Sequence, residues 1–143
     1  MTLRILCSVL AAVALASARA DEADKEVKAR KVALDLAGAF SNDGFKIRDG
    51  HWSGELNQGG HAVVAVNLYA GNQYWFSVGT DDQAARFSVQ LHDEHGKLLA
   101  GEEYQGDATA AAGFSPTISG QYFVSVAASD AATGTYCLVY SYQ

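Results

Sequence analysis

The sequence predicts an all-β fold, an antiparallel β-sandwich of the jelly-roll kind, preceded by one amphipathic N-terminal helix. From Ala62 onward, apolar residues recur at every second position in several short stretches separated by turns rich in Gly, Asn and Asp. Such alternation indicates strands with one buried face, and several short strands at this spacing are typical of a sandwich or barrel. Before Gly44 the apolar residues recur at helical spacing instead.

Residues 1–20 have the layout of a secretory signal peptide. A basic residue near the start is followed by an apolar stretch over 5–16 and by the small residues Ala18 and Ala20. This pattern predicts cleavage between Ala20 and Asp21, so the mature protein would be periplasmic or secreted. The alternative is an uncleaved anchor, but the apolar stretch is short for a membrane span. We therefore expect no membrane insertion of the mature chain.

Residues 21–43 predict an amphipathic helix and its cap. Acidic residues crowd the first turn, where the helix dipole favours negative charge, and Asp24 with Lys28 is one of several favourable i,i+4 pairs. The turn at 41–44 ends the helix. The apolar stripe packs either on the domain's own core or on a partner. Its members are Ala29, Val32, Ala33, Leu36 and Phe40.

Residues 44–143 form one predicted β-sandwich domain. Gly71 and Gly96 lie in short turns between alternating stretches, where a hairpin requires positive φ. The expected strands cover 62–69, 74–78, 86–91, 97–100, 122–126 and 136–142.

Four ordered segments between Gly54 and Tyr142 resemble the bacterial pre-peptidase C-terminal domain. These segments are 66–76, 87–96, 119–126 and 134–138. The resemblance implies a non-catalytic extracytoplasmic β-sandwich, which in some members binds substrate matrix or carbohydrate. No peptidase is attached to this chain, so it looks like a free-standing version of the module with its own N-terminal helix.

Charge and cysteine content limit the possible classes of function. The chain has 10 basic and 16 acidic residues, a net charge of −6, and no basic stripe that could neutralise phosphates. We therefore expect no nucleic-acid partner. Removal of residues 1–20 would lower the charge to −8, because Arg4 and Arg19 are lost with no acidic residue. It would also leave Cys137 alone, so the exported domain would have no internal disulfide.

The sequence contains no recognisable catalytic motif. The G-x-S-x-G, H-E-x-x-H and P-loop patterns are absent, and none of the four histidines lies in a catalytic setting. Cys137 stands in the middle of a predicted strand, where a small packing residue is the usual role. We therefore predict that the protein is not an enzyme and assign no catalytic residue.

Metal ligands are not assigned either. The segment 92–95 (His-Asp-Glu-His) is the densest polar cluster, but four convergent ligands from one tight turn are sterically difficult. The acid pairs Asp81–Asp82 and Glu102–Glu103 leave calcium open, without assigned ligands, because no D-x-D-x-D-G loop is present. We expect no other cofactor.

Large aromatic residues are the candidate binding residues. Strand alternation points Trp75 and Phe123 outward, together with Cys137 and Val139, which gives the sandwich an unusually apolar outer surface. Either the helix covers this surface through Val32, Leu36 and Phe40, or the surface is open and binds a partner.

His51 and Trp52 form a second candidate, because the Trp52 ring could stack on a sugar. The function predicted from these features is a non-enzymatic exported binding or accessory domain that recognises a macromolecule or a glycan. Its partner would be a protein or a polysaccharide. The alternatives are an accessory subunit or inhibitor of a secreted enzyme, a carbohydrate-binding module, and a small enzyme.

Overall fold

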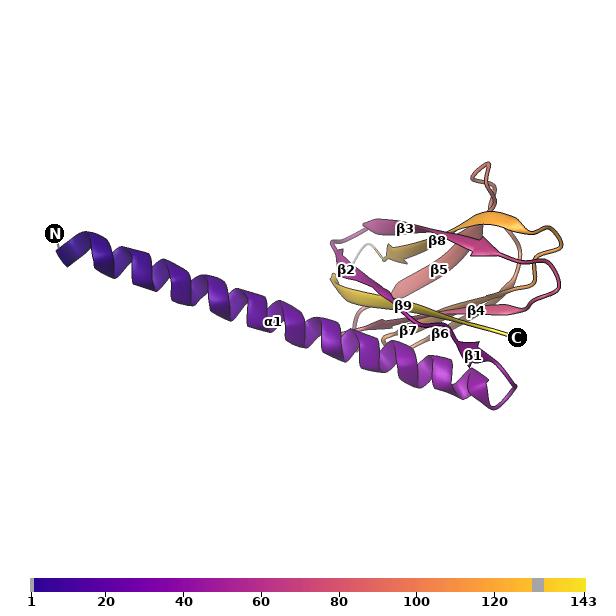
Figure 1. Ribbon diagram of the computed structural model, residues 1–143, viewed down its shortest axis with the longest axis horizontal. Coiled ribbons are helices and arrows are strands. Elements are labelled where there is room, and N and C mark those ends of the chain that lie inside the picture. Colours follow the sequence, from indigo (N-terminus) through magenta and orange to yellow (C-terminus); the bar gives the residue numbers. More distant parts are fainter. Residues whose placement is uncertain (1, 130–132) are drawn as a thin grey trace.

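Two antiparallel sheets pack face to face, and one long helix lies against the outside of the larger sheet (Figure 1). The computed structural model describes the backbone of residues 2–129 and 133–143, and side chains from residue 15 onward within those ranges. The elements are α1 (Thr2–Ser41), β1 (Lys46–Ile47), β2 (Trp52–Leu56), β3 (His61–Leu68), β4 (Tyr74–Thr80), β5 (Phe87–His92), β6 (Glu102–Gly106), β7 (Thr109–Phe114), β8 (Gly120–Ala128) and β9 (Gly134–Tyr142).

The larger sheet has the order β9-β4-β7-β6, and β1 and β2 both pair with β9 along its free side. The smaller sheet has the order β3-β8-β5. Every pairing between these strands is antiparallel. The predicted antiparallel all-β sandwich with one N-terminal helix is therefore confirmed.

The core lies between the sheets and consists of the inward-pointing residues of each strand. Phe76, Leu68 and Leu138 are the largest side chains that solvent does not reach. Apolar residues alternate along β3, β5 and β8, and it is these residues that are buried, because the other face of the smaller sheet is solvated. The positive φ of Gly71 and Gly96, +92° and +79°, is the one that the hairpin turns require.

Four strands differ from the sequence expectation. The strands β1, β2, β6 and β7 were not expected from the sequence. In addition, the strand expected at 97–100 is absent, and Leu98 makes only an isolated bridge to His92. β7 contains three consecutive alanines that are all buried. Alanine has low strand propensity, and a strand buried on both faces shows no alternation.

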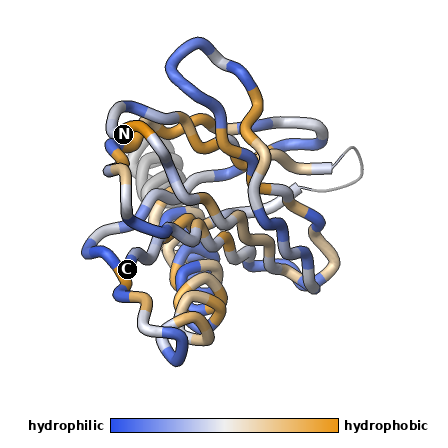
Figure 2. Tube along the Cα trace, turned by 90° about the vertical axis from the view of Figure 1, so that its right-hand side faces the viewer, coloured by the Kyte–Doolittle hydropathy of each residue, from blue (hydrophilic) through white to orange (hydrophobic). Residues whose placement is uncertain are grey.

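The helix α1 continues without a break from the predicted signal segment into 21–41, and its N-terminal half projects beyond the sandwich (Figure 1). Viewed from its end in Figure 2, it lies on one side of the two sheets. Ala29, Ala33 and Ala37, one turn apart, are fully buried against β4 and β9. Over the described residues, no helical stretch has both the length and the hydropathy of a membrane-spanning segment.

The contact line of α1 differs from the expected one. Val32 and Leu36 are only half-buried, whereas the alanines occupy the centre of the interface. The cause is the close approach of the helix backbone to Gly79, where an added Cβ would lie 2.3 Å from the Ala33 nitrogen. Only the smallest side chains fit along this line.

Gly38→Ala is expected to stabilise the protein by about 0.5–1 kcal/mol, because glycine inside a helix costs roughly that much relative to alanine. Gly38 is exposed on α1, and a Cβ built there meets nothing within 4 Å. Denaturant unfolding followed by circular dichroism measures the change. Gly50→Ala is the control, since it also has open space but φ of +93°, so the substitution should destabilise. A loss of stability in Gly38→Ala would contradict the prediction.

Candidate functional site

Trp75 lies between α1 and the larger sheet. Its ring stacks on Phe40 of the helix with a centroid distance of 4.4 Å and an interplanar angle of 7°. Gly113 on β7 leaves room for the ring, because a Cβ there would lie 3.0 Å from the indole. Cys137 and Val139 are buried under the same helix. Trp75 is therefore half-buried in the packing between α1 and the sheet, and it also lines a hollow of about 320 Å³ together with Phe45 and Phe114.

Phe123 lies on the other sheet. It is on the outer face of β8, half-buried, with Ala65 of β3 and His92 of β5 as its register partners. The expected single surface containing both Trp75 and Phe123 does not exist, because β4 and β8 belong to opposite sheets whose outer faces point apart. The helix covers Trp75 and leaves Phe123 uncovered.

His51 belongs to a polar contact between α1 and β2. Its Nε2 lies 3.4 Å from Oε1 of Glu26, and the Ser53 hydroxyl donates a hydrogen bond of 2.9 Å to the same oxygen. The hydrogen bond from Ser53 and, to a smaller extent, the contact with His51 lower the pKa of the Glu26 carboxyl. Successive residues of a strand point to opposite faces, so Ser53 faces the helix while Trp52 faces the sandwich interior. His51 and Trp52 thus serve different surfaces.

Trp52 forms one wall of a cleft at the side of the sandwich. Its ring stacks on Tyr140 of β9, with centroids 6.1 Å apart and 14° between the planes. The guanidinium carbon of Arg48 lies 6.0 Å from the Trp52 ring centre and 5.1 Å from that of Tyr140. The opposite wall is β3 with the residue that follows it. The cleft has a volume of about 300 Å³, and its lining residues are Arg48, Trp52, Ala65, Val66, Asn67, Tyr69 and Tyr140.

The cleft combines one cationic group with three aromatic rings. Arg48 carries a permanent positive charge with several donors, and the rings of Trp52, Tyr69 and Tyr140 offer aromatic surface. Burial raises the pKa of the Tyr140 hydroxyl, so this group stays protonated at neutral pH. The described lining residues contain no carboxyl, imidazole or thiol group. This set of groups suits binding through stacking and charge.

Trp52 was predicted from the sequence as a binding residue, but its neighbours in the cleft were not. Arg48, Asn67 and Tyr69 carry no pattern that separates them from ordinary strand and turn residues. Tyr140 is mostly buried. The pairing of β2 with β9 brings Trp52 and Tyr140 together across 88 residues of sequence, and alternation contains no information on which strands pair.

The acidic loops use their carboxylates to hold turns. Oδ1 of Asp93 accepts hydrogen bonds from the backbone N–H groups of His95 and Lys97, both 2.9 Å, and these bonds lower the pKa of Asp93. Oδ1 of Asp81 accepts a 2.8 Å bond from the backbone N–H of Thr135. In the part of the chain that the structure describes, no three His, Cys, Asp or Glu side chains are grouped as metal ligands.

Cys137 is expected to be unreactive in the folded protein. It is fully buried under α1, and burial raises the pKa of its thiol from 9.0 to about 11. In a Cys7→Ser chain, a thiol reagent at pH 8 should label Cys137 only after denaturation. Rapid labelling of the native protein would contradict the buried position.

The same shift predicts a pH dependence of stability. Between pH 9 and 11 the unfolded chain loses the thiol proton that the folded chain keeps, so the free energy of unfolding should fall as pH rises. Cys137→Ala should remove this part of the pH dependence while leaving the contribution of the other titrating groups.

Comparison with known proteins identifies the fold. No family model and no curated protein sequence matches the chain. The solved pre-peptidase C-terminal domain of a collagenase from Bacillus anthracis is 26% identical, with a TM-score of 0.50 over 64% of this chain and 87% of that domain. A periplasmic inhibitor of g-type lysozyme from Aeromonas hydrophila is 15% identical, with a TM-score of 0.48 over 66% of this chain and 85% of its own. The Yersinia pseudotuberculosis-derived mitogen is 12% identical, with a TM-score of 0.48 over 67% and 85%. The chain therefore has a β-sandwich fold like that of the pre-peptidase C-terminal domain.

Proposed function

We propose that this protein is an exported, non-catalytic accessory domain that binds a protein partner at the cleft between Trp52 and β3. The observation that carries the proposal is the composition of that cleft, which combines aromatic rings with an arginine. Aromatic and arginine side chains are the groups enriched where proteins bind one another. The likeness to a domain of a collagenase supports an accessory role beside a secreted enzyme.

The position of the helix contacts supports export with cleavage after Ala20. All side chains from Leu15 to Asp24 are exposed, Glu22 and Glu26 line a shallow hollow with β2, and Ala29 is the first described helix residue that is fully buried. Cleavage after Ala20 would keep Ala29, Ala33 and Ala37, the helix residues that are fully buried against the sandwich. The cut would leave a helix that begins about two turns before Ala29.

Expression with the native N-terminus, followed by cell fractionation and intact-mass measurement, tests export. We expect protein in the periplasm or medium whose mass corresponds to a chain beginning at Asp21. Full-length protein retained in the cytoplasm would contradict the proposal. The control is Ala18→Arg with Ala20→Arg, which removes the small residues that the peptidase requires and should block processing.

Binding is tested with two defined probes, a displayed library of random 12-residue peptides and a panel of insoluble polysaccharides comprising cellulose, chitin and peptidoglycan. We expect enrichment of peptides, and weaker binding by Tyr69→Ala than by Tyr104→Ala. Both tyrosines are well exposed, but Tyr104 lies on β6 outside the cleft. Failure to bind any peptide or polysaccharide would overturn the proposed function.

A glycan is the second candidate ligand. The rings of Trp52 and Tyr69 together with the Asn67 amide are groups that stack on a sugar ring and bond its hydroxyls. Retention on a polysaccharide that Tyr69→Ala abolishes, without peptide enrichment, would favour a carbohydrate-binding module over a protein-binding domain.

A further inference from the structure

β3 is a long edge strand without a backbone partner on its outer side. It spans eight residues, His61–Leu68, and is the terminal strand of the smaller sheet. Among the described residues, its backbone bonds only to β8. In an antiparallel pair, alternate residues point their N–H and C=O groups away from the partner strand. β3 therefore presents a row of unsatisfied backbone groups.

The other sheet edges are protected. The outer edge of β6 carries Glu102 and Glu103, and the opposite edge of the larger sheet is split into the two short strands β1 and β2 by Gly50 with φ of +93°. Charged residues and interrupted strands are the usual means of preventing strand addition.

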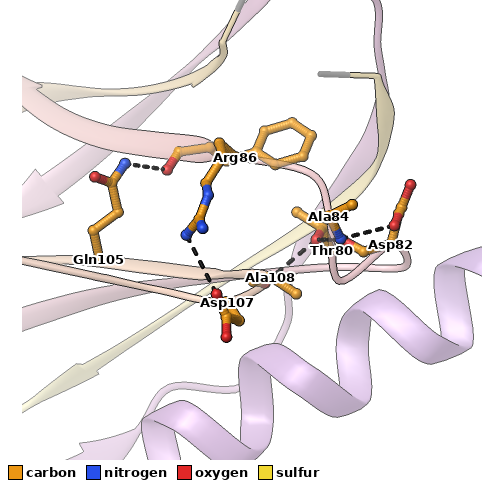
Figure 3. Close-up of polar contacts among 8 residues, drawn as sticks. Thr80, Asp82, Ala84, Arg86, Gln105, Asp107 and Ala108 are labelled. Atoms are coloured by element: carbon orange, nitrogen blue, oxygen red, sulfur yellow. Dashed lines mark hydrogen bonds and ion pairs between the residues drawn. The ribbon is translucent and has the colours of Figure 1, made fainter. Parts of the chain in front are cut away.

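The edge of β5 is covered by neighbouring residues. Gln105 donates a 3.0 Å bond to the carbonyl of Phe87, and Arg86 pairs with Asp107 at 3.4 Å beside it (Figure 3). At the other end, the Leu99 N–H donates a 2.9 Å bond to the Leu91 carbonyl. By contrast, β3 contains no Lys, Arg, Asp, Glu or Pro. It is the edge that lacks these protections.

The cleft runs along this open edge. Ala65, Val66 and Asn67 of β3 line one side, and Trp52 with Arg48 lines the other. An extended segment paired with β3 would lie in the cleft, so that alternate side chains meet the aromatic rings and the guanidinium group.

Arg48 indicates the charge of the segment. Its guanidinium group contacts the rings of Trp52 and Tyr140 and the Asp49 carbonyl at 3.5 Å, and within the described residues no carboxylate lies within 4 Å of it. An acidic side chain would complement it. A second copy of β3 carries no acidic residue, and the net charge of −6 makes two copies repel.

We propose that an extended peptide segment of a partner protein adds as a strand to the open edge of β3 and places an acidic side chain against Arg48. This inference rests on the proposed protein-binding function and names the form of its ligand. Backbone bonds to β3 supply affinity, and the Arg48 contact with the rings of Trp52 and Tyr140 sets register and specificity.

The test uses the purified full-length protein and synthetic peptides from the 12-residue library, with affinity measured by fluorescence anisotropy. We expect the peptides to share an acidic residue within an alternating apolar stretch. Arg48→Gln should weaken binding about tenfold or more, the usual effect of losing a hydrogen bond to a charged group. Lys97→Gln removes an equal charge at an exposed turn and should leave affinity unchanged.

Backbone N-methylation of the peptide tests strand pairing directly. Methylation of the alternate residues whose N–H groups bond to β3 should abolish binding. Methylation of the intervening residues, whose N–H groups point away from β3, should leave binding unchanged. Binding that ignores this alternation or survives Arg48→Gln would overturn the inference while leaving peptide binding, and hence the proposed function, in place. Absence of peptide binding would overturn both. A dimer in sedimentation that excludes peptide would instead assign the edge to a second copy.

Discussion

Gly79→Ala is expected to displace α1 from the larger sheet. The new Cβ would lie 2.3 Å from the Ala33 nitrogen and 2.5 Å from the Ala29 carbonyl oxygen, and both are helix backbone atoms that no side-chain rotation can move. Overpacking of a tight interface costs typically 1–3 kcal/mol, so we expect a loss of about 3 kcal/mol. Denaturant unfolding measures the loss, and hydrogen exchange along α1 reports the displacement.

Gly120→Ala provides the matched control. This glycine also lies in a strand, but an added Cβ meets nothing within 4 Å, so its stability should change by less than about 1 kcal/mol. Cys137 gives a second readout, because displacement of the helix should expose its thiol to labelling. Equal stability of Gly79→Ala and Gly120→Ala would show that α1 does not approach β4 as closely as described.

Trp75→Ala is expected to lower stability by about 3 kcal/mol, because large aromatic residues in packed interfaces lose 3–5 kcal/mol on truncation and this one is only half-buried. The loss includes the stacking with Phe40. Thermal and denaturant unfolding measure it. Peptide or glycan affinity of the folded fraction should remain unchanged, since Trp75 does not line the cleft at β3.

Phe40→Leu is the companion variant. It keeps apolar volume in the contact but removes the ring, so its loss should be smaller than that of Trp75→Ala. The two losses should not add, because both variants break the same stacked pair. A stable Trp75→Ala protein that has lost its ligand would contradict the packing role and make Trp75 a binding residue.

Sequence patterns predicted β3, β4, β5, β8 and β9. β3, β5 and β8 each have one solvated face, so their apolar residues alternate and the inward set is readable. The same patterns missed β7, whose consecutive alanines have low strand propensity, and β1 and β2, which are short and lie beside glycine turns. The sequence correctly indicated which side of the helix faces the sheet. It wrongly placed the middle of that contact at the larger side chains Val32 and Leu36.

The sequence by itself determined the period of each segment, and with it the all-β class, the N-terminal helix and which side of most strands faces inward. Only the tertiary structure decided which faces meet. It placed Trp75 under α1 and Phe123 on the opposite sheet, and it joined Arg48, Trp52 and Tyr140 at the open edge of β3. The physical reason is that periodicity is set by local backbone geometry, whereas strand pairing and the approach of α1 to Gly79 depend on contacts between residues far apart in the chain.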